Sequence, residues 1–175
     1  MIGTIIDIKN FKKYFQLTTG LKNQNLSIKN NIMSELSIEK IIPTDEQVRC
    51  LYELLNKRDY NISHKHRVAF ENHESFVHNH PYRAWFLIKL ETVIIGSFYI
   101  SNENTIGINI ENYADENLVS AVFFYVKKNY QPLGAISSVR SGEFSINISP
   151  SNHLLSKTLK NLGAELAQIT FYLPR

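Results

Sequence analysis

The chain has 175 residues, of which 43% are hydrophobic and 20% charged, and its net charge is +3. This length suits one domain with a proper core and is too short for two ordinary domains. Adjacent basic residues occur only as short pairs such as Lys12-Lys13 and Lys127-Lys128. Because nucleic-acid binders usually carry a basic stripe, we expect no nucleic-acid partner.

Cysteine content and hydropathy indicate the compartment. The single cysteine, Cys50, excludes an internal disulfide framework and fits a reducing cytoplasm. The N-terminus lacks a basic start followed by an apolar stretch, so we do not expect a secretory signal. The most apolar region, Ala84 to Ile100, is interrupted by Lys89 and Glu91 and is too polar to span a bilayer. We expect a cytoplasmic protein without membrane contact.

Residues 1–35 differ from the rest of the chain. A candidate strand, Thr4 to Ile8, precedes a polar, Asn-rich stretch from Lys22 to Asn31. We interpret this segment as an appendage that packs loosely or contacts a partner. An over-long gene start, with Met33 as the true beginning, is the alternative. The main domain is then residues 36–175.

From Leu36 the pattern predicts defined elements. Leu36 to Ile42 alternates as a strand. Thr44 and Gln47 form a capping box, in which each side chain satisfies the other residue's backbone amide. The helix that follows has a one-sided apolar stripe, formed by Val48, Leu51, Tyr52 and Leu55. A second helix over Phe70 to Asn79 stops before Pro81.

The second half alternates strands and helices. Three strands with short turns predict an antiparallel meander, at Ala84–Lys89, Val93–Ile100 and Thr105–Ile110. A helix from Asp115 to about Lys128 precedes a strand at Phe144–Ile148. Helix Ser151–Leu162 ends at Gly163 in a left-handed cap, and a final strand covers Leu166–Leu173.

This order predicts an α/β (α+β) fold with a mixed sheet and helices on both faces. The centre of the sheet is the antiparallel meander. The strands Thr105–Ile110 and Phe144–Ile148 are joined through a helix, so they should form one parallel pair.

Element order and three stretches of sequence resemble the GNAT superfamily of acyl-CoA-dependent N-acyltransferases, over about Leu36 to Leu173. The stretches are FENHESFVHNHPYRAWFLI, IIGSFYISNENTIGINI and INISPSNHLLSKTLKNLG. The first is similar to a bacterial subgroup of small GNAT proteins with a histidine in the second helix. The last is similar to the family motif that frames the pantetheine arm, here with Asn147, Asn152 and Gly163.

The resemblance implies acetyl-CoA as co-substrate. Its pantetheine arm would lie between the strands matching Thr105–Ile110 and Phe144–Ile148. Its diphosphate would sit at the N-terminus of the next helix, where free amides and a partial positive charge attract anions. The backbone amide near Ile110 would polarise the thioester carbonyl. The implied cofactor-binding residues are Ile108, Asn109, Ile110, Asn117, Leu118, Val119, Ser120, Asn147 and Asn152.

The helix start departs from the family pattern. The usual glycine turn is replaced, with Ala114, Asn117 and Val119 at its landmarks. Asn117 tolerates a left-handed conformation, whereas Val119 adds a branched side chain where the family keeps the surface bare. Asp115 and Glu116 should cap the helix. They should also repel a diphosphate, by about 1 kcal/mol in water and about 4 kcal/mol in a surface-like dielectric for charges roughly 4 Å apart.

Three residues are candidates for proton transfer. His73 lies on the helix that borders the family's acceptor cleft and is a candidate base, or else a hydrogen-bonded structural histidine. Tyr82 is a proton relay or substrate wall, or else packs with Trp85 between helix and sheet. Glu111 is a general base or a plain strand-end carboxylate. Leu159 replaces the tyrosine that protonates the leaving thiolate in many GNAT enzymes.

Five histidines cluster in one short region and suggest zinc ligands: His64, His66, His73, His78 and His80. The nearby Glu71 and Glu74 also suit a solvated helix and no cysteine assists, so we expect no metal site.

The leading hypothesis is acetyl transfer from acetyl-CoA to a small amine, with an amino sugar suggested by subgroup resemblance. The alternative is a catalytically inactive GNAT-like binding or scaffolding module that has lost coenzyme A binding. A third hypothesis is an enzyme whose acyl donor places no diphosphate at this helix. Free amides around residues 113–120 would favour an enzyme, and a turn closed by its own carboxylates would favour a module. A homodimer through strand edges near the C-terminus is compatible with the sequence.

Overall fold

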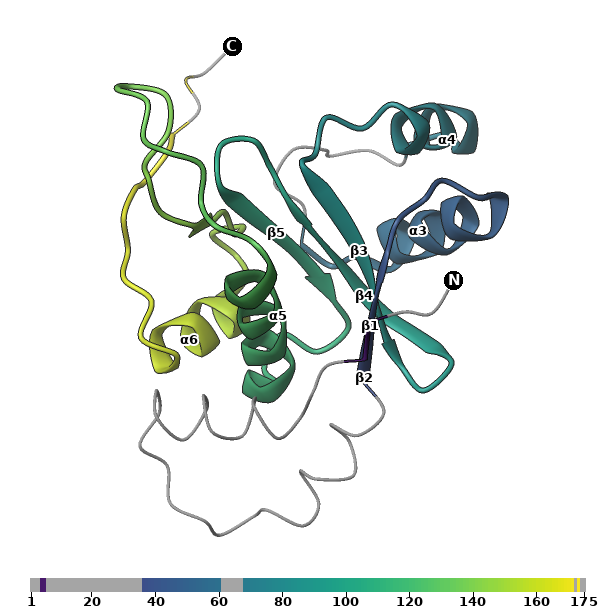
Figure 1. Ribbon diagram of the computed structural model, residues 1–175. Helices are drawn as coiled ribbons and strands as arrows, with labels where there is room; N and C mark the ends of the chain where they lie inside the picture. Colours follow the sequence, from purple (N-terminus) through teal and green to yellow (C-terminus); the bar gives the residue numbers. More distant parts are fainter. Residues whose placement is uncertain (1–3, 6–35, 61–67, 172, 174–175) are drawn as a thin grey trace, which may run out of the picture.

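The computed structural model describes residues 4–5, 36–60, 68–171 and 173 (Figure 1). One sheet contains six strands in chain order. The strands are β1 Thr4–Ile5, β2 Leu36–Lys40, β3 Ala84–Leu90, β4 Val93–Ile100, β5 Thr105–Ile110 and β6 Ser145–Ile146. The helices are α3 Asp45–Lys57, α4 Phe70–His78, α5 Glu116–Asn129 and α6 His153–Asn161.

Strand directions confirm the predicted mixed sheet. Neighbours from β1 to β5 are antiparallel, and only β5 and β6 pair in parallel. Of the candidate strand Thr4–Ile8, residues 4–5 pair with β2, and residues 6–8 lie outside the described residues. None of the described helices is long and apolar enough to cross a membrane.

Helices cover both faces of the sheet, as predicted. Successive side chains of a strand point to opposite faces, and β3 follows this rule. Phe86 and Ile88 pack in the core formed with α5 and α6, whereas Trp85 and Leu87 pack in the core formed with α3 and α4. Figure 1 shows these two pairs of helices on opposite sides of the sheet.

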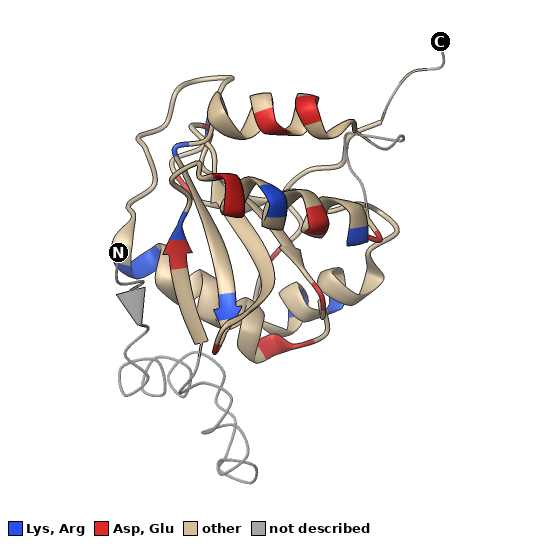
Figure 2. Ribbon diagram, turned by 90° about the vertical axis from the view of Figure 1, so that its right-hand side faces the viewer, with Lys and Arg blue, Asp and Glu red and all other residues tan. Residues whose placement is uncertain are grey.

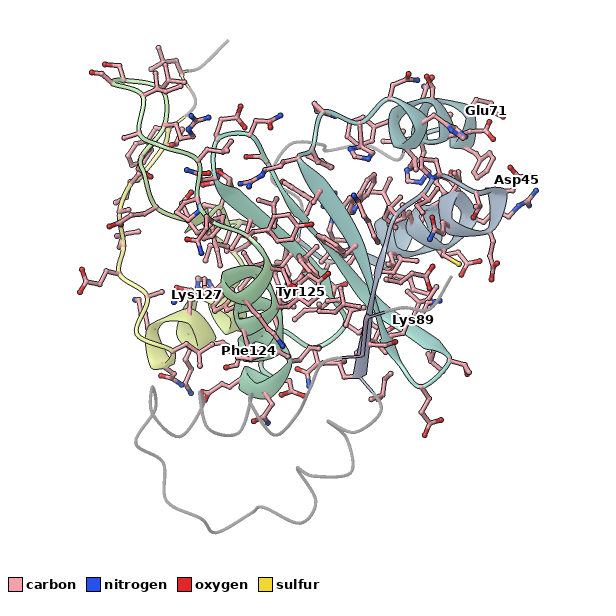
Figure 3. All side chains as sticks on the ribbon, viewed as in Figure 1. Asp45, Glu71, Lys89, Phe124, Tyr125 and Lys127 are labelled. Carbon is pink, nitrogen blue, oxygen red and sulfur yellow. The ribbon has the colours of Figure 1, made fainter. Side chains whose placement is uncertain are left out.

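Aromatic rings pack between α5 and the sheet. Phe86 and Phe98 stack with their centroids 4.8 Å apart. The ring of Tyr125 meets both edge-on, at 5.3 Å and 5.9 Å. Figure 3 shows Tyr125 on the side of α5 that faces the strands. This packing fixes the helix whose N-terminus borders the candidate site.

The capping box of α3 is half confirmed. The Gln47 amide donates to Thr44 Oγ1 at 3.3 Å, as predicted. The reciprocal bond is wrong, because the Gln47 side chain accepts from the Ile42 amide at 2.8 Å and donates to Glu39 at 2.7 Å. Glu39 also pairs with Lys89 across β2 and β3. The Ile42 amide, five residues before Gln47, therefore replaces the Thr44 amide as the donor to the Gln47 side chain.

The predicted left-handed cap of α6 is confirmed. Gly163 has a φ of 83°, which side chains other than hydrogen strongly disfavour. Its amide donates to Lys160 O at 3.0 Å, and the Ala164 amide donates to Leu159 O at 2.9 Å. This pair of bonds is a Schellman motif, and it sets where α6 ends.

The predicted final strand Leu166–Leu173 is wrong for the described residues of that range, none of which is in a strand. Its apolar side chains are exposed, namely Leu166 by 77%, Ile169 by 66%, Phe171 by 85% and Leu173 by 87%. Alternation alone does not make a strand, because a strand also needs a neighbour to pair with. β6, the last strand of the sheet, has only two residues and offers too short a ladder.

Asn104 fixes where β6 begins. Its side chain is fully buried, and its φ is 63°. The amide nitrogen donates to Leu133 O at 2.8 Å and to Ser141 O at 2.9 Å, and the amide oxygen accepts from Leu133 N at 2.7 Å. The Asn104 carbonyl accepts from Ser145 N at 3.0 Å. One residue thus ties the segment before β6 to the β4–β5 turn.

We predict that Asn104→Ala lowers the free energy of unfolding by about 2–4 kcal/mol, because three backbone groups lose a partner and a positive φ becomes more costly. Urea unfolding measures the change. Asn129→Ala is the matched control, because Asn129 is exposed and its side chain bonds only to Tyr125 O within α5. Equal losses for the two variants would contradict the anchoring role.

Candidate functional site

β5 and β6 pair briefly and then diverge. Only Thr105 with Ser145 and Ile106 with Ile146 are paired, although β5 continues to Ile110. Thr105 O and Glu111 N bond to the β4 side, to Ser101 N at 2.9 Å and Ile95 O at 3.2 Å. Antiparallel ladders use alternate residues in this way. The backbone groups of residues 106, 108 and 110 therefore face the edge from which β6 departs, which is the divergence that the resemblance implies.

Tyr113 covers the end of this edge. Its side chain is only 6% exposed. Its hydroxyl donates to Asn109 Oδ1 at 3.4 Å. Burial raises the pKa of Tyr113.

Two further contacts hold Tyr113 in place. Thr158 Oγ1 of α6 donates to the Tyr113 carbonyl at 2.9 Å in a buried position. The Tyr60 ring meets the Tyr113 ring edge-on, with centroids 5.8 Å apart. Sequence reasoning missed Tyr113. The available signal was a lone aromatic residue in the otherwise polar or small turn Glu111 to Asp115.

The N-terminus of α5 is capped by its own carboxylate, as predicted. Asp115 Oδ1 accepts from Asn117 N at 2.9 Å and from Leu118 N at 3.2 Å. In the turn before it, Asn112 Oδ1 accepts from Ala114 N at 3.1 Å. The amides of Asn117 and Leu118, which the resemblance assigns to a diphosphate, already have an anionic partner.

The other residues of this helix start differ from expectation. Asn117 lies inside α5 with no positive φ, so the left-handed option is not used. Val119 is fully buried in the core, so its branched side chain does not stand on the surface. Ser120 is half-buried one position later. Glu116 accepts from Asn161 Nδ2 at 2.6 Å, and this bond joins the start of α5 to the end of α6.

On the α6 side, Asn152 is a helix cap. Its side chain is 3% exposed, and Oδ1 accepts from Leu155 N at 3.0 Å. Asn147 is exposed just after β6, and Leu159 is buried in the core. The geometry thus gives Asn152 a structural partner, and pantetheine contacts by Asn147 and Asn152 remain predictions.

His73 is held by α3. Its side chain is 5% exposed, and Nε2 lies 3.1 Å from Val48 O. A carbonyl only accepts, so Nε2 carries the proton and donates it. Burial lowers the pKa of His73, and the Tyr52 ring packs at 5.3 Å. These contacts favour the structural alternative, and a catalytic role for His73 remains a prediction.

Tyr82 is part of an aromatic stack on the same face. Its ring lies 3.8 Å from that of Tyr99, almost parallel, and meets Trp85 edge-on at 5.2 Å. Burial raises the pKa of Tyr82 far above its usual range, so the phenol stays protonated and does not act as a base. Tyr99 in turn lies over Gly107, where an added Cβ would be 2.2 Å from the ring.

The predicted residues therefore form separate groups. Asn109 accepts from the Tyr113 hydroxyl, and its Nδ2 donates to Leu54 O at 3.2 Å. Ile110 and Tyr113 belong to the same buried core cluster. Glu111 is exposed at the end of β5, whereas His73 packs on α3. Among the described residues no group of three or more His, Cys, Asp or Glu could hold a metal. His64 and His66 lie outside that part of the chain.

We predict that His73 makes the free energy of unfolding depend on pH. Because its folded pKa lies below the ordinary value of 6.5, the unfolded chain binds more protons below that pH. The contribution is complete above about pH 6.5 and is lost as the pH falls toward the folded pKa. Urea unfolding at about pH 7.5 and about pH 5.5 measures the free energy of unfolding. Its decrease between these two pH values should be smaller for His73→Gln than for the parent. Equal losses would contradict this assignment.

Comparisons with known proteins show similarity in structure only. No protein-family profile matches the sequence, and no curated protein is significantly similar to it. An aminoglycoside N-acetyltransferase AAC(6')-Iy, solved in complex with CoA, matches with a TM-score of 0.50 and 14% identity, over 80% of this chain and 95% of that chain. A possible acetyltransferase from Clostridium difficile 630 matches with a TM-score of 0.50 and 9% identity, over 80% and 97% of the chains.

At such identities the likeness concerns the fold, and both matches cover nearly the whole of the other chain. The element order, the single parallel pair and the divergence of β6 from β5 agree with it. The chain has the fold of the GNAT superfamily.

Proposed function

We propose that the protein is an N-acetyltransferase that moves an acetyl group from acetyl-CoA to a small amine. The observation that carries the proposal is the divergence of β6 after Ile146, which leaves the β5 edge at Ile108 and Ile110 without a strand beside it among the described residues. A pantetheine arm contains amides that can pair with such an edge. The solved AAC(6')-Iy complex, which contains CoA, supports the choice of donor.

The chemistry follows from this placement. The deprotonated amine attacks the thioester carbon, the C–S bond breaks, and the thiolate leaves. The Ile110 amide donates to the developing oxyanion. The amine proton passes through water to Glu111, which is exposed at the end of β5. His73 is the less suitable base because its Nε2 proton is bound to Val48 O. Leu159 supplies no proton, so the thiolate takes one from solvent.

Charge on the α3–α4 side suits a cationic acceptor. Figure 2 shows acidic residues along both helices with fewer basic ones between them. The acidic residues are Asp45, Glu46, Glu53, Glu71 and Glu74, and the basic ones are Arg49 and Lys57. Such a field raises the local concentration of positively charged amines. An amino sugar is the acceptor that the subgroup resemblance suggests.

A second candidate function is a binding module that no longer uses coenzyme A. Asp115 favours it, because its carboxylate occupies the amides of Asn117 and Leu118. A turn closed by its own carboxylate was the feature expected of such a module. The two functions differ in whether acetyl-CoA binds and is turned over.

We predict weak binding of acetyl-CoA by the parent chain and binding at least about tenfold tighter by Asp115→Gly/Asn117→Gly. Removing the carboxylate frees two amides and removes repulsion worth roughly 1–4 kcal/mol, and 1.4 kcal/mol is tenfold. Val119 is kept, because replacing a fully buried valine would create a cavity. Calorimetric titration measures the affinities, and an acetylation assay over a panel of amines follows.

The control is Asp45→Gly, which removes an acidic residue from the first turn of α3 rather than α5 and should leave affinity unchanged. If neither the parent nor the Asp115→Gly/Asn117→Gly variant binds acetyl-CoA, the acetyltransferase proposal is rejected and the binding module stands.

A further inference from the structure

The C-terminal segment (residues 166–171 and 173 of the described chain) and the outer edge of β6 are both unpaired in one copy of the protein. We infer that they pair between two copies, with the segment of each copy added as a strand beside β6 of the other. The result is a symmetric dimer with two exchanged strands. The inference does not depend on acetyl transfer, because it concerns an interaction surface on the outer side of β6.

The C-terminal segment has the side-chain pattern of a strand. In an extended chain, alternation places residues two apart on the same face. Gln168 and Thr170 share one face, and Gln168 Nε2 donates to Thr170 Oγ1 at 3.1 Å. The other face is apolar and contains Ala167, Ile169, Phe171 and Leu173. The backbone of residues 166–171 makes no hydrogen bond to any other described residue. The segment therefore lacks only a pairing partner.

The outer edge of β6 can provide one, because the sheet ends there. Ser145 N donates to Asn104 O, so Ser145 faces β5, and alternation turns the backbone groups of residues 144, 146 and 148 outward. Within the described chain these outward groups have no hydrogen-bonding partner. Proteins usually protect such an edge with charged residues, proline or a covering element. Residues 144–148 contain neither a charged residue nor a proline.

The side chains of this edge also suit the segment. Phe144, Ile146 and Ile148 are half-buried and pack against the core that contains α5 and α6. A strand beside them, with its apolar face on the same side, would extend this core and remove exposed apolar surface from water. Residues 166–173 span about 26 Å when extended, which covers the roughly 17 Å of residues 144–148.

A second copy is the partner that these features favour. Within one copy, the Schellman cap at Gly163 sets the direction in which the chain leaves α6. Figure 1 shows the segment running along the outer side of the molecule without joining the sheet. Each copy has one unpaired segment and one open edge, so two copies satisfy both features of each other. Such a reciprocal contact closes after two copies, whereas an unrelated partner would satisfy only one feature.

Sedimentation equilibrium of the full chain tests the exchange. We expect the parent to show a monomer–dimer equilibrium and Phe171→Asp to weaken dimerisation at least about tenfold, because the carboxylate would be placed in the extended core. Thr170→Asp is the matched control, since it puts the same charge on the polar face one residue away, and it should dimerise like the parent. Residues 170 and 171 are both exposed in the single copy, so thermal unfolding should show both variants folded.

A parent that stays monomeric overturns the inference. So does a dimer that Phe171→Asp leaves intact, or one that both substitutions weaken equally, because the apolar face would then not be the part that is buried.

Hydrogen exchange followed by NMR distinguishes pairing between copies from pairing within one. The Ile146 amide faces the outer edge, so its exchange should slow as the concentration of the parent rises and should stay fast in Phe171→Asp. Protection that does not change with concentration means that the segment pairs with β6 of its own copy, and the exchange is then wrong. Fast exchange at every concentration overturns it as well. Neither result affects the acetyltransferase proposal, which acetyl-CoA binding tests separately.

Discussion

The two-residue pairing of β5 with β6 is the constraint on which the candidate site depends. Asn104 starts it through Ser145, and it ends at Ile106 and Ile146. Beyond that point the backbone groups of β5 that face β6 need other partners, because buried amides are almost always hydrogen-bonded. At this end of β5 the buried Tyr113 donates its hydroxyl to Asn109 Oδ1 at 3.4 Å. The divergence therefore creates a hydrogen-bonding demand that a bound ligand or the protein itself can satisfy.

The start of α5 also has backbone amides that need hydrogen-bonding partners. A helix N-terminus has unpaired amides that attract an anion, and here the anion is the Asp115 carboxylate. Under the proposed function, the Asp115 carboxylate occupies amides that a diphosphate would need. Acyl-CoA binding would therefore displace bonds that already exist, and only the difference between the two sets contributes to affinity.

Local patterns predicted those parts of the fold that local interactions determine. The strands Val93–Ile100 and Thr105–Ile110 were predicted to the residue, because alternation and a polar turn define both ends. The Asp115 cap could also be predicted, because its bonds reach only two and three residues along the chain. The prediction of a final strand at Leu166–Leu173 was wrong, because a strand needs a pairing partner that lies far away in the sequence. Tyr113 was missed because Thr158, 45 residues away, holds its backbone, and no spacing rule contains that contact.

The divergence also bears on whether the site is retained or lost. Pairing of β6 along the whole of β5 would satisfy the amides of Ile108 and Ile110 without help from a side chain. A module that only presents its outer surface has no use for an interrupted ladder, and local departures from the most consistent structure tend to occur at functional sites. The buried Asn104 anchors the start of β6, whereas a single carboxylate, that of Asp115, closes the start of α5. The anchor at β6 thus depends on more hydrogen bonds than the cap of α5 does, and this difference supports the proposed enzyme over the binding module.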